Sequence, residues 1–369
     1  MKNAVSVLFL ITSIGLYSPV KAQNLTKEST NAFALFTKTR DIKQLQLAKT
    51  NIDEAFKTSK DSLSGKNNLI RALVYSTLSA VDSNRTLTYK VDPLEDAWRS
   101  FAKFRNNPKI LTDYEAELEF ITNQLAWAYL FEAKNALSYS SYEEAERSFS
   151  MVDSLTDGDL HIHHNLAVLN ERLGNIERAI HYFRELIEKS PDPAYYFSLS
   201  DLYSIKGQKD KYLSILQEGR KLYPDHRDLV FKEINYFADR NDYRILIKLL
   251  PNAIRIDEHN ISLNYLAGFS YEMVGNFQKA EEFYEKVLNS DPNNFDGNYA
   301  LGLLYLNLYA KDGTKNQFLH DALIHLSKAN EIDQNEMKAL QSLAILYEYS
   351  GDLIQLQRVN NKINQLKLN

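Results

Sequence analysis

Three histidines and two aspartates near the middle of the chain are of the types that could bind a metal ion. His161, His163 and His164 closely follow Asp157 and Asp159, and imidazole and carboxylate groups together can ligate a transition metal. The same segment begins a stretch with helical apolar periodicity, for which either aspartate is a natural N-cap. We therefore interpret the cluster as the start of a helix, and we expect neither a metal nor a cofactor.

Motifs of the common enzyme classes are absent from the sequence. It contains no Gly-x-Ser-x-Gly elbow, no phosphate-binding glycine loop and no His-Glu-x-x-His zinc motif. The chain also has no cysteine, which excludes a thiolate zinc site and a cysteine nucleophile. Acidic pairs such as Glu143-Glu144 and Glu281-Glu282 fit a solvated helix face. We expect a protein that is not an enzyme.

The composition narrows the class of partner. A formal net charge of -5 disfavours nucleic acid, which requires clustered basic side chains. Hydrophobic residues make up 44% of the chain, so it is neither disordered nor embedded in a membrane. The 12 Gly and 8 Pro are too few for a loop-rich β fold, and the 23 Tyr and 18 Phe require a structure that packs or presents them.

The N-terminus resembles a secretory signal. Lys2 precedes a mostly apolar run from Ala4 to Tyr17, and Val20-Lys21-Ala22 offers a cleavage site before Gln23. The run is short for a membrane span and is interrupted by polar residues, although an uncleaved anchor is the alternative. We predict a signal peptide over residues 1–22, export to a bacterial periplasm or envelope or secretion, and no transmembrane segment after its removal.

Aromatic and glycine positions recur with a period of about 34 residues, and a fixed period near this length is typical of helical repeat arrays. Tyr203, Phe237, Tyr271 and Tyr305 keep one constant interval. A second set keeps the same interval or departs from it by a single position: Gly174, Gly207, Asn241 and Gly275. Tyr347 follows Tyr305 by more than one period, which indicates one insertion between them.

This pattern resembles the tetratricopeptide-repeat family, in which each repeat is a pair of antiparallel helices, A and B. The resemblance is clearest over Ile261 to Asn294 and is strong over Leu160 to Asp192. Gly268 and Ala280 are small where the paired helices cross, and Gly275 ends helix A because glycine accepts the left-handed cap conformation. The expected fold is an all-α solenoid of helix-turn-helix repeats with a divergent helical N-terminal part.

The resemblance divides the chain into three segments: a signal peptide over 1–22, a divergent helical region over 23–115, and a repeat solenoid over 116–369. Within the divergent region, Asn51 to Lys57 is expected to belong to a lone helix. Three lengthened connections are expected to form exposed excursions between helix A and helix B, near Asp82 to Asp92, near Ala136 to Ser141, and after Tyr305.

A second aromatic column suggests where a partner binds. Phe197, Phe231, Tyr265 and Tyr299 follow one another at the same constant interval, and Phe269 lies one helical turn after Tyr265. The family resemblance implies that these positions of helix A face a concave groove, where rings suit peptide side chains or sugar faces. The alternative is that the rings only fill spaces between neighbouring A helices.

The expected function is a non-enzymatic scaffold that holds a partner protein or peptide in this groove. Some family members bind C-terminal carboxylates, but the corresponding positions here are His164, Val168, Ser198, Asp228 and Lys232, of which only Lys232 could serve. A carbohydrate-binding accessory protein of the envelope is one alternative, and an enzyme with an unrecognised site in the N-terminal third is another. The oligomeric state is not predicted.

Overall fold

The computed structural model describes residues 20–57, 62–82, 85–156, 158–314 and 316–368, and these residues form α-helices joined by turns and loops, without a strand. They fall into two compact units, residues 1–190 and 191–369. The predicted signal peptide lies almost wholly outside the described residues, and the first helix begins at Val20. Within the described part, no helix combines the length and apolarity that crossing a membrane requires.

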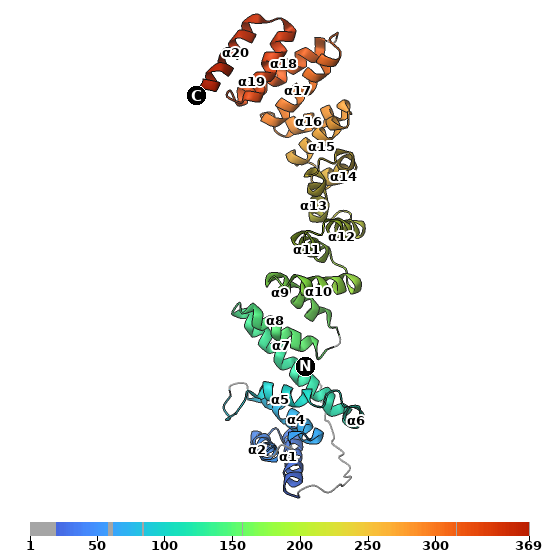
Figure 1. Ribbon diagram of the computed structural model, residues 1–369, viewed down its shortest axis with the longest axis vertical. Helices are drawn as coiled ribbons and strands as arrows, with labels where there is room; N and C mark the ends of the chain where they lie inside the picture. Colours follow the sequence, from blue (N-terminus) through green and yellow to red (C-terminus); the bar gives the residue numbers. More distant parts are fainter. Residues whose placement is uncertain (1–19, 58–61, 83–84, 157, 315, 369) are drawn as a thin grey trace. The chain divides into compact units, whose positions relative to one another are not determined.

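The first unit pairs its helices in chain order (Figure 1). Its helices are α1 (Val20–Thr39), α2 (Ile42–Ala55), α4 (Gly65–Val81), α5 (Pro93–Ala102), α6 (Pro108–Asp113), α7 (Glu115–Ser138), α8 (Tyr142–Asp153), α9 (Leu160–Arg172) and α10 (Ile176–Lys189). The expectation of a lone helix near Asn51 was wrong, because α1 and α2 pack against each other. Ser29 in α1 donates a hydrogen bond to the Ala48 carbonyl in α2.

The second unit continues the alternation of A and B helices, and each helix packs on the next. The A helices are α11 (Pro193–Ile205), α13 (Arg227–Ala238), α15 (Ile261–Met273), α17 (Phe295–Lys311) and α19 (Met337–Ser350). The B helices are α12 (Lys209–Leu222), α14 (Tyr243–Ile256), α16 (Phe277–Ser290), α18 (Asn316–Ile332) and α20 (Leu353–Leu368). The helix-pair architecture predicted from the period is therefore confirmed.

The turns between A and B helices follow the prediction made from their glycines. Gly275 has φ of +84° and Asn241 has φ of +56°, both in the left-handed region. In each case the next residue donates its backbone N–H to a carbonyl near the end of helix A, as from Asn276 to Tyr271 at 2.9 Å. This hydrogen bond defines a Schellman cap, which satisfies carbonyls that the helix end would leave unpaired.

In the described part of the chain, two of the three expected excursions are taken up mainly by longer helices. Ser140 has φ of +58°, and Ser141 donates to the Ala136 carbonyl at 2.9 Å. The connection is thus the same short cap, and the extra residues after Tyr129 prolong α7. The insertion after Tyr305 behaves alike: α17 and α18 each have 17 residues, against 13 in α15 and 14 in α16. Helical propagation adds one hydrogen bond per residue, which an open loop would lack.

The third excursion, between α4 and α5, is a real loop with an ordered anchor. The buried Asp82 carboxylate accepts hydrogen bonds from the Thr86 backbone and hydroxyl, the Leu87 backbone and the Tyr89 hydroxyl. These donors stabilise the charged form and lower the pKa of Asp82, although burial acts in the opposite direction.

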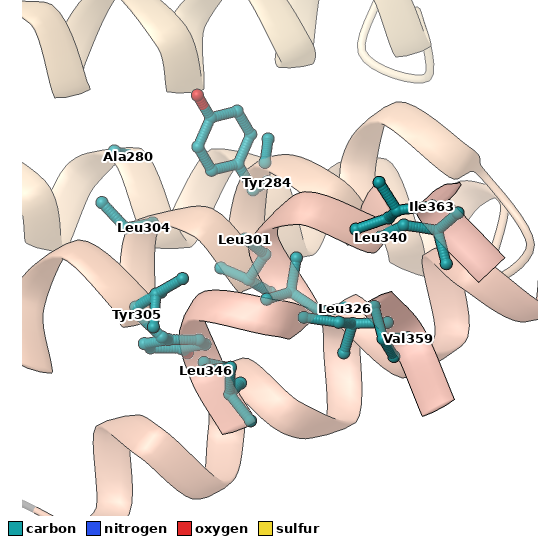
Figure 2. Packing of buried hydrophobic residues seen from close by; sticks show 14 residues of the cluster. Ala280, Tyr284, Leu301, Leu304, Tyr305, Leu326, Leu340, Leu346, Val359 and Ile363 are labelled. Carbon is teal, nitrogen blue, oxygen red and sulfur yellow. The ribbon is translucent and has the colours of Figure 1, made fainter. Parts of the chain in front are cut away.

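The core of the C-terminal repeats rests on close contact between paired helices (Figure 2). Ala280 is completely buried, and a Cβ added to Gly268 would lie 2.6 Å from the Tyr284 ring. Small residues at this crossing therefore let the ring of α16 lie against the backbone of α15. The labelled side chains in Figure 2 come from α16 to α20, so one buried cluster runs through several repeats.

The repeat Arg227 to Asn260, which departs most from the family pattern, carries a charge where neighbouring repeats carry leucine or alanine. Glu233 occupies the column of Leu199 and Leu301, yet it is buried. Arg220 of the preceding helix α12 forms an ion pair with Glu233, and Gln217 donates to the same carboxylate at 3.3 Å. The buried charge is thus paired across the boundary between two repeats.

We predict that Ala280→Leu destabilises the protein by about 1–3 kcal/mol, because it overfills the crossing of α15 and α16. Repeats couple mainly to their neighbours, so amide hydrogen exchange should rise mostly within residues 227–336. Ala310→Leu, at an exposed position of α17, is the control and should change little. A rise spread evenly over the whole chain would contradict the repeat architecture.

We also predict that Arg220→Met lowers the stability by about 2 kcal/mol, since it leaves the Glu233 carboxylate buried and unpaired. The value is below that of a fully buried pair because the Arg220 side chain is about one third exposed. Adding Glu233→Leu should restore most of the loss. Urea unfolding of both variants tests this, and a double variant less stable than Arg220→Met would refute it.

Candidate partner-binding face

The structure places the predicted aromatic column on successive A helices of the second unit. Phe197 lies in α11, Phe231 in α13, Tyr265 and Phe269 in α15, and Tyr299 in α17. A period of one helix pair returns each position to the same face of the next A helix. All five side chains are half-buried, so each ring packs against the protein with part of its surface and exposes the rest.

Phe197 is held by a lysine of the next A helix. Lys232 Nζ in α13 lies 3.5 Å from the centroid of the Phe197 ring and 2.6 Å from Asp201 Oδ1. It also donates to the Phe197 carbonyl at 3.3 Å. The cation covers one face of the ring. Lys232, the only residue suited to binding a C-terminal carboxylate, is therefore already engaged with α11.

Tyr299 repeats this arrangement at the other end of the unit. Lys338 Nζ in α19 lies 5.1 Å from the Tyr299 ring centroid and 3.7 Å from Asp296 Oδ1. The Phe295 and Tyr299 rings are stacked, with centroids 5.9 Å apart. At both ends of the column, a ring and an acid of one A helix thus bind a lysine of the next.

The three central rings contact their own helix or the B helices. Arg227 lies over Phe231 at 5.0 Å, Tyr265 packs on Tyr284 at 5.8 Å, and Phe269 meets Tyr243 edge to face at 5.5 Å. Burial of the phenol raises the pKa of Tyr265, so the hydroxyl stays neutral near pH 7. These contacts fix the orientation of each ring.

Sequence reasoning missed a more exposed apolar set on the A helices α11, α15 and α19. Ile205, Met273 and Tyr349 are 68%, 53% and 49% exposed, and Ile345 in α19 is also exposed. Ile205 follows Phe197 by two turns, as Met273 follows Tyr265. The signal was available, because Ile205 and Met273 are separated by two full periods of the sequence repeat.

A shallow cleft borders this face at the central repeats. It has a volume of about 330 Å³, and it lies between the turn before α14 and the end of α15. The residues that line it are Asn241, Asp242, Tyr243, Arg244, Ile245, Met273 and Val274. Tyr243, which lines the cleft, also contacts Phe269 of the aromatic column.

Among the described residues, the side chains of the histidine cluster do not gather into a group of three that could hold a metal. His163 is buried, with Nε2 at 2.9 Å from Asp153 Oδ1 and Nδ1 at 3.0 Å from Glu185 Oε2. The two carboxylates therefore lie at opposite nitrogens of one ring. Asp159 caps α9 through the His161 backbone N–H, as the sequence predicts, while Asp157 lies outside the described residues. Across the described ranges, no cluster of three His, Asp or Glu side chains could hold a metal.

Comparison with known proteins agrees with the repeat pattern. Residues 160–193 and 261–294 match the family model of the tetratricopeptide repeat, and these are the two segments in which the sequence pattern is clearest. The TPR repeat-containing protein YpiA of Bacillus subtilis (strain 168) is 21% identical over 267 residues, which cover 67% of this chain and 61% of the relative. The chain therefore spans about three fifths of that relative's length.

Solved structures of similar fold include repeat proteins from several sources. The C-terminal part of a TPR repeat-containing protein from Cytophaga hutchinsonii is 17% identical, with a TM-score of 0.48, and covers 63% of this chain and 93% of its own. YrrB, described as a TPR protein with an unusual peptide-binding site, is 20% identical, with a TM-score of 0.41. The matched region covers 54% of this chain and 98% of the YrrB chain.

Proposed function

We propose that this chain, a tetratricopeptide-repeat protein, is a non-enzymatic scaffold that binds a segment of a partner protein along its A helices. The binding face comprises the aromatic column of Phe197, Phe231, Tyr265, Phe269 and Tyr299, together with the exposed apolar residues that follow it. The observation that carries the proposal is this recurrence of exposed and half-exposed apolar side chains on one face of successive A helices.

The physical argument rests on exposure and rigidity. Exposed apolar side chains that recur along one face mark an interaction surface more often than isolated ones do. Here the central rings are already fixed by Arg227, Tyr284 and Tyr243. Little conformational entropy is then lost when a partner covers them, so more of the burial energy contributes to affinity.

Export is the second part of the proposal. The apolar run from Ala4 to Tyr17 and the small residues before Gln23 favour a cleaved secretory signal. The scaffold would then act in the periplasm or envelope. A protein without cysteine needs no disulfide chemistry in that oxidising compartment.

We predict that Phe231→Ala combined with Tyr265→Ala weakens capture of the native partner by roughly 100-fold or more, because buried aromatic anchors commonly contribute about 2 kcal/mol each and about 1.4 kcal/mol is tenfold in affinity. Pull-downs from an envelope extract and melting curves are measured on the same variant. Phe277→Ala with Phe318→Ala, two half-buried rings of B helices, is the control. If the rings serve only as packing, the variant instead loses about 3–5 kcal/mol of stability per emptied site.

We predict that the mature protein begins at Gln23. Mass spectrometry of the native protein, purified from its source, checks this directly. A full-length chain retained in the membrane fraction would favour an uncleaved anchor and reverse the proposed location.

A further inference from the structure

We infer that the partner segment is basic as well as apolar, because exposed carboxylates predominate among the charged side chains of the binding face that have no ion-pair partner in the described part of the second unit. The inference rests on the proposed function and adds to it the chemistry of the ligand. It is carried by which charged side chains of the A helices have ion-pair partners and which have none.

Three carboxylates on this face are exposed. Asp228 lies in the first turn of α13, Asp239 follows the end of the same helix, and Glu348 lies in the last turn of α19. None of the three forms an ion pair within the described ranges of the chain. Asp239 occupies the position in its repeat that Met273 occupies in the next, and Glu348 directly precedes Tyr349, so these two acids lie near the exposed apolar residues, whereas Asp228 lies at the other end of α13.

Unlike the three acids, the lysines of this face already have ion-pair partners within the protein. Lys232 is bound to Asp201 and covers Phe197, and Lys338 lies beside Asp296 and over Tyr299. Each therefore neutralises an acid of the preceding A helix.

The neighbouring arginines are also engaged. Arg227 pairs with Asp257 at 3.0 Å, and Arg240 lies over the Tyr236 ring at 3.7 Å. In the adjoining cleft, Asp242 and Arg244 both line the wall and contribute no net charge. Arg240 keeps its positive charge, because a ring does not neutralise it, but the three unpaired carboxylates outnumber it, so the net charge left for a partner is negative.

A basic and apolar segment complements this surface in both respects. Its apolar side chains would cover Ile205, Met273, Ile345 and Tyr349, and its lysines or arginines would meet Asp228, Asp239 and Glu348. Complementary charge speeds association and excludes partners of the wrong sign more than it adds affinity. An acidic segment would place like charges together without water to screen them.

The test is a selection from a phage-displayed library of random 12-residue peptides on the immobilised full chain. We expect the selected peptides to be enriched in Lys or Arg next to Leu, Ile or aromatic residues. Binding of the synthesised peptides should weaken as NaCl rises from about 50 to 500 mM, because salt screens exposed charges. Asp228→Asn/Asp239→Asn/Glu348→Gln should weaken it about tenfold.

Two matched variants separate the charge inference from the proposed face. Asp210→Asn/Glu258→Gln/Glu285→Gln removes three exposed acids outside this face and should leave binding unchanged. Ile205→Ser/Met273→Ser should weaken binding, whereas Leu222→Ser/Ile324→Ser, at exposed apolar sites of B helices, should not.

Several outcomes would overturn the inference. Selected peptides that are neutral or acidic, or that bind the neutralised variant as tightly as the wild type, would show that the charge is irrelevant. If the serine variant still weakens binding in that case, the face remains the binding site and only its charge preference is refuted. If no peptide distinguishes either variant from its control, both the inference and the proposed face are wrong.

Discussion

The close crossing of the two helices in each repeat is the constraint on which the second unit depends. A ring can lie against a facing backbone only if that backbone carries no side chain at the contact. In one repeat the glycine is on helix A, Gly268, and the ring is Tyr284 of helix B. In another the roles are exchanged: Gly219 lies on helix B, and a Cβ there would come within 2.8 Å of Tyr196. Both repeats therefore have a ring packed against a glycine backbone, but the glycine lies on helix A in one and on helix B in the other.

This exchange explains an irregularity in the sequence. Tyr212 stands where other repeats have a small residue such as Ala280, and a ring at that point would separate the helices. The structure turns Tyr212 toward the next repeat, where it stacks on Tyr236 at 5.3 Å. Gly219 then supplies the close approach. Close packing of the two helices in a repeat requires a small residue on one helix opposite a large residue on the other. It does not require the small residue to occupy the same position in every repeat.

Contacts between repeats have a different character from contacts within them. Inside a pair they are tightly packed and largely apolar, as at Ala280, although the Tyr284 hydroxyl of α16 donates a hydrogen bond to Glu272 of α15. Between pairs they include charges: Glu233 with Arg220, and Lys232 with Asp201. Ion pairs constrain the register of neighbouring repeats through their geometry, even where desolvation offsets much of their energy. Lys232, Arg227 and Lys338 lie over Phe197, Phe231 and Tyr299, so a cation limits how much of these three rings a partner can reach.

The sequence alone determined the features that arise within one repeat. The period, the helix pairs, and the left-handed turns at Gly275 and Asn241 follow from glycine conformations and apolar spacing, which act over a few residues. It misjudged Ser140 and the insertion after Tyr305, because added length can prolong a helix or form a loop, and packing decides which. Only the tertiary structure decided which rings a lysine covers, which acids remain unpaired, and where Tyr212 points. Those outcomes depend on contacts between side chains that are a full repeat apart in the sequence. The regular spacing of the repeats predicts where the helix backbones lie, but it does not predict which side chains touch.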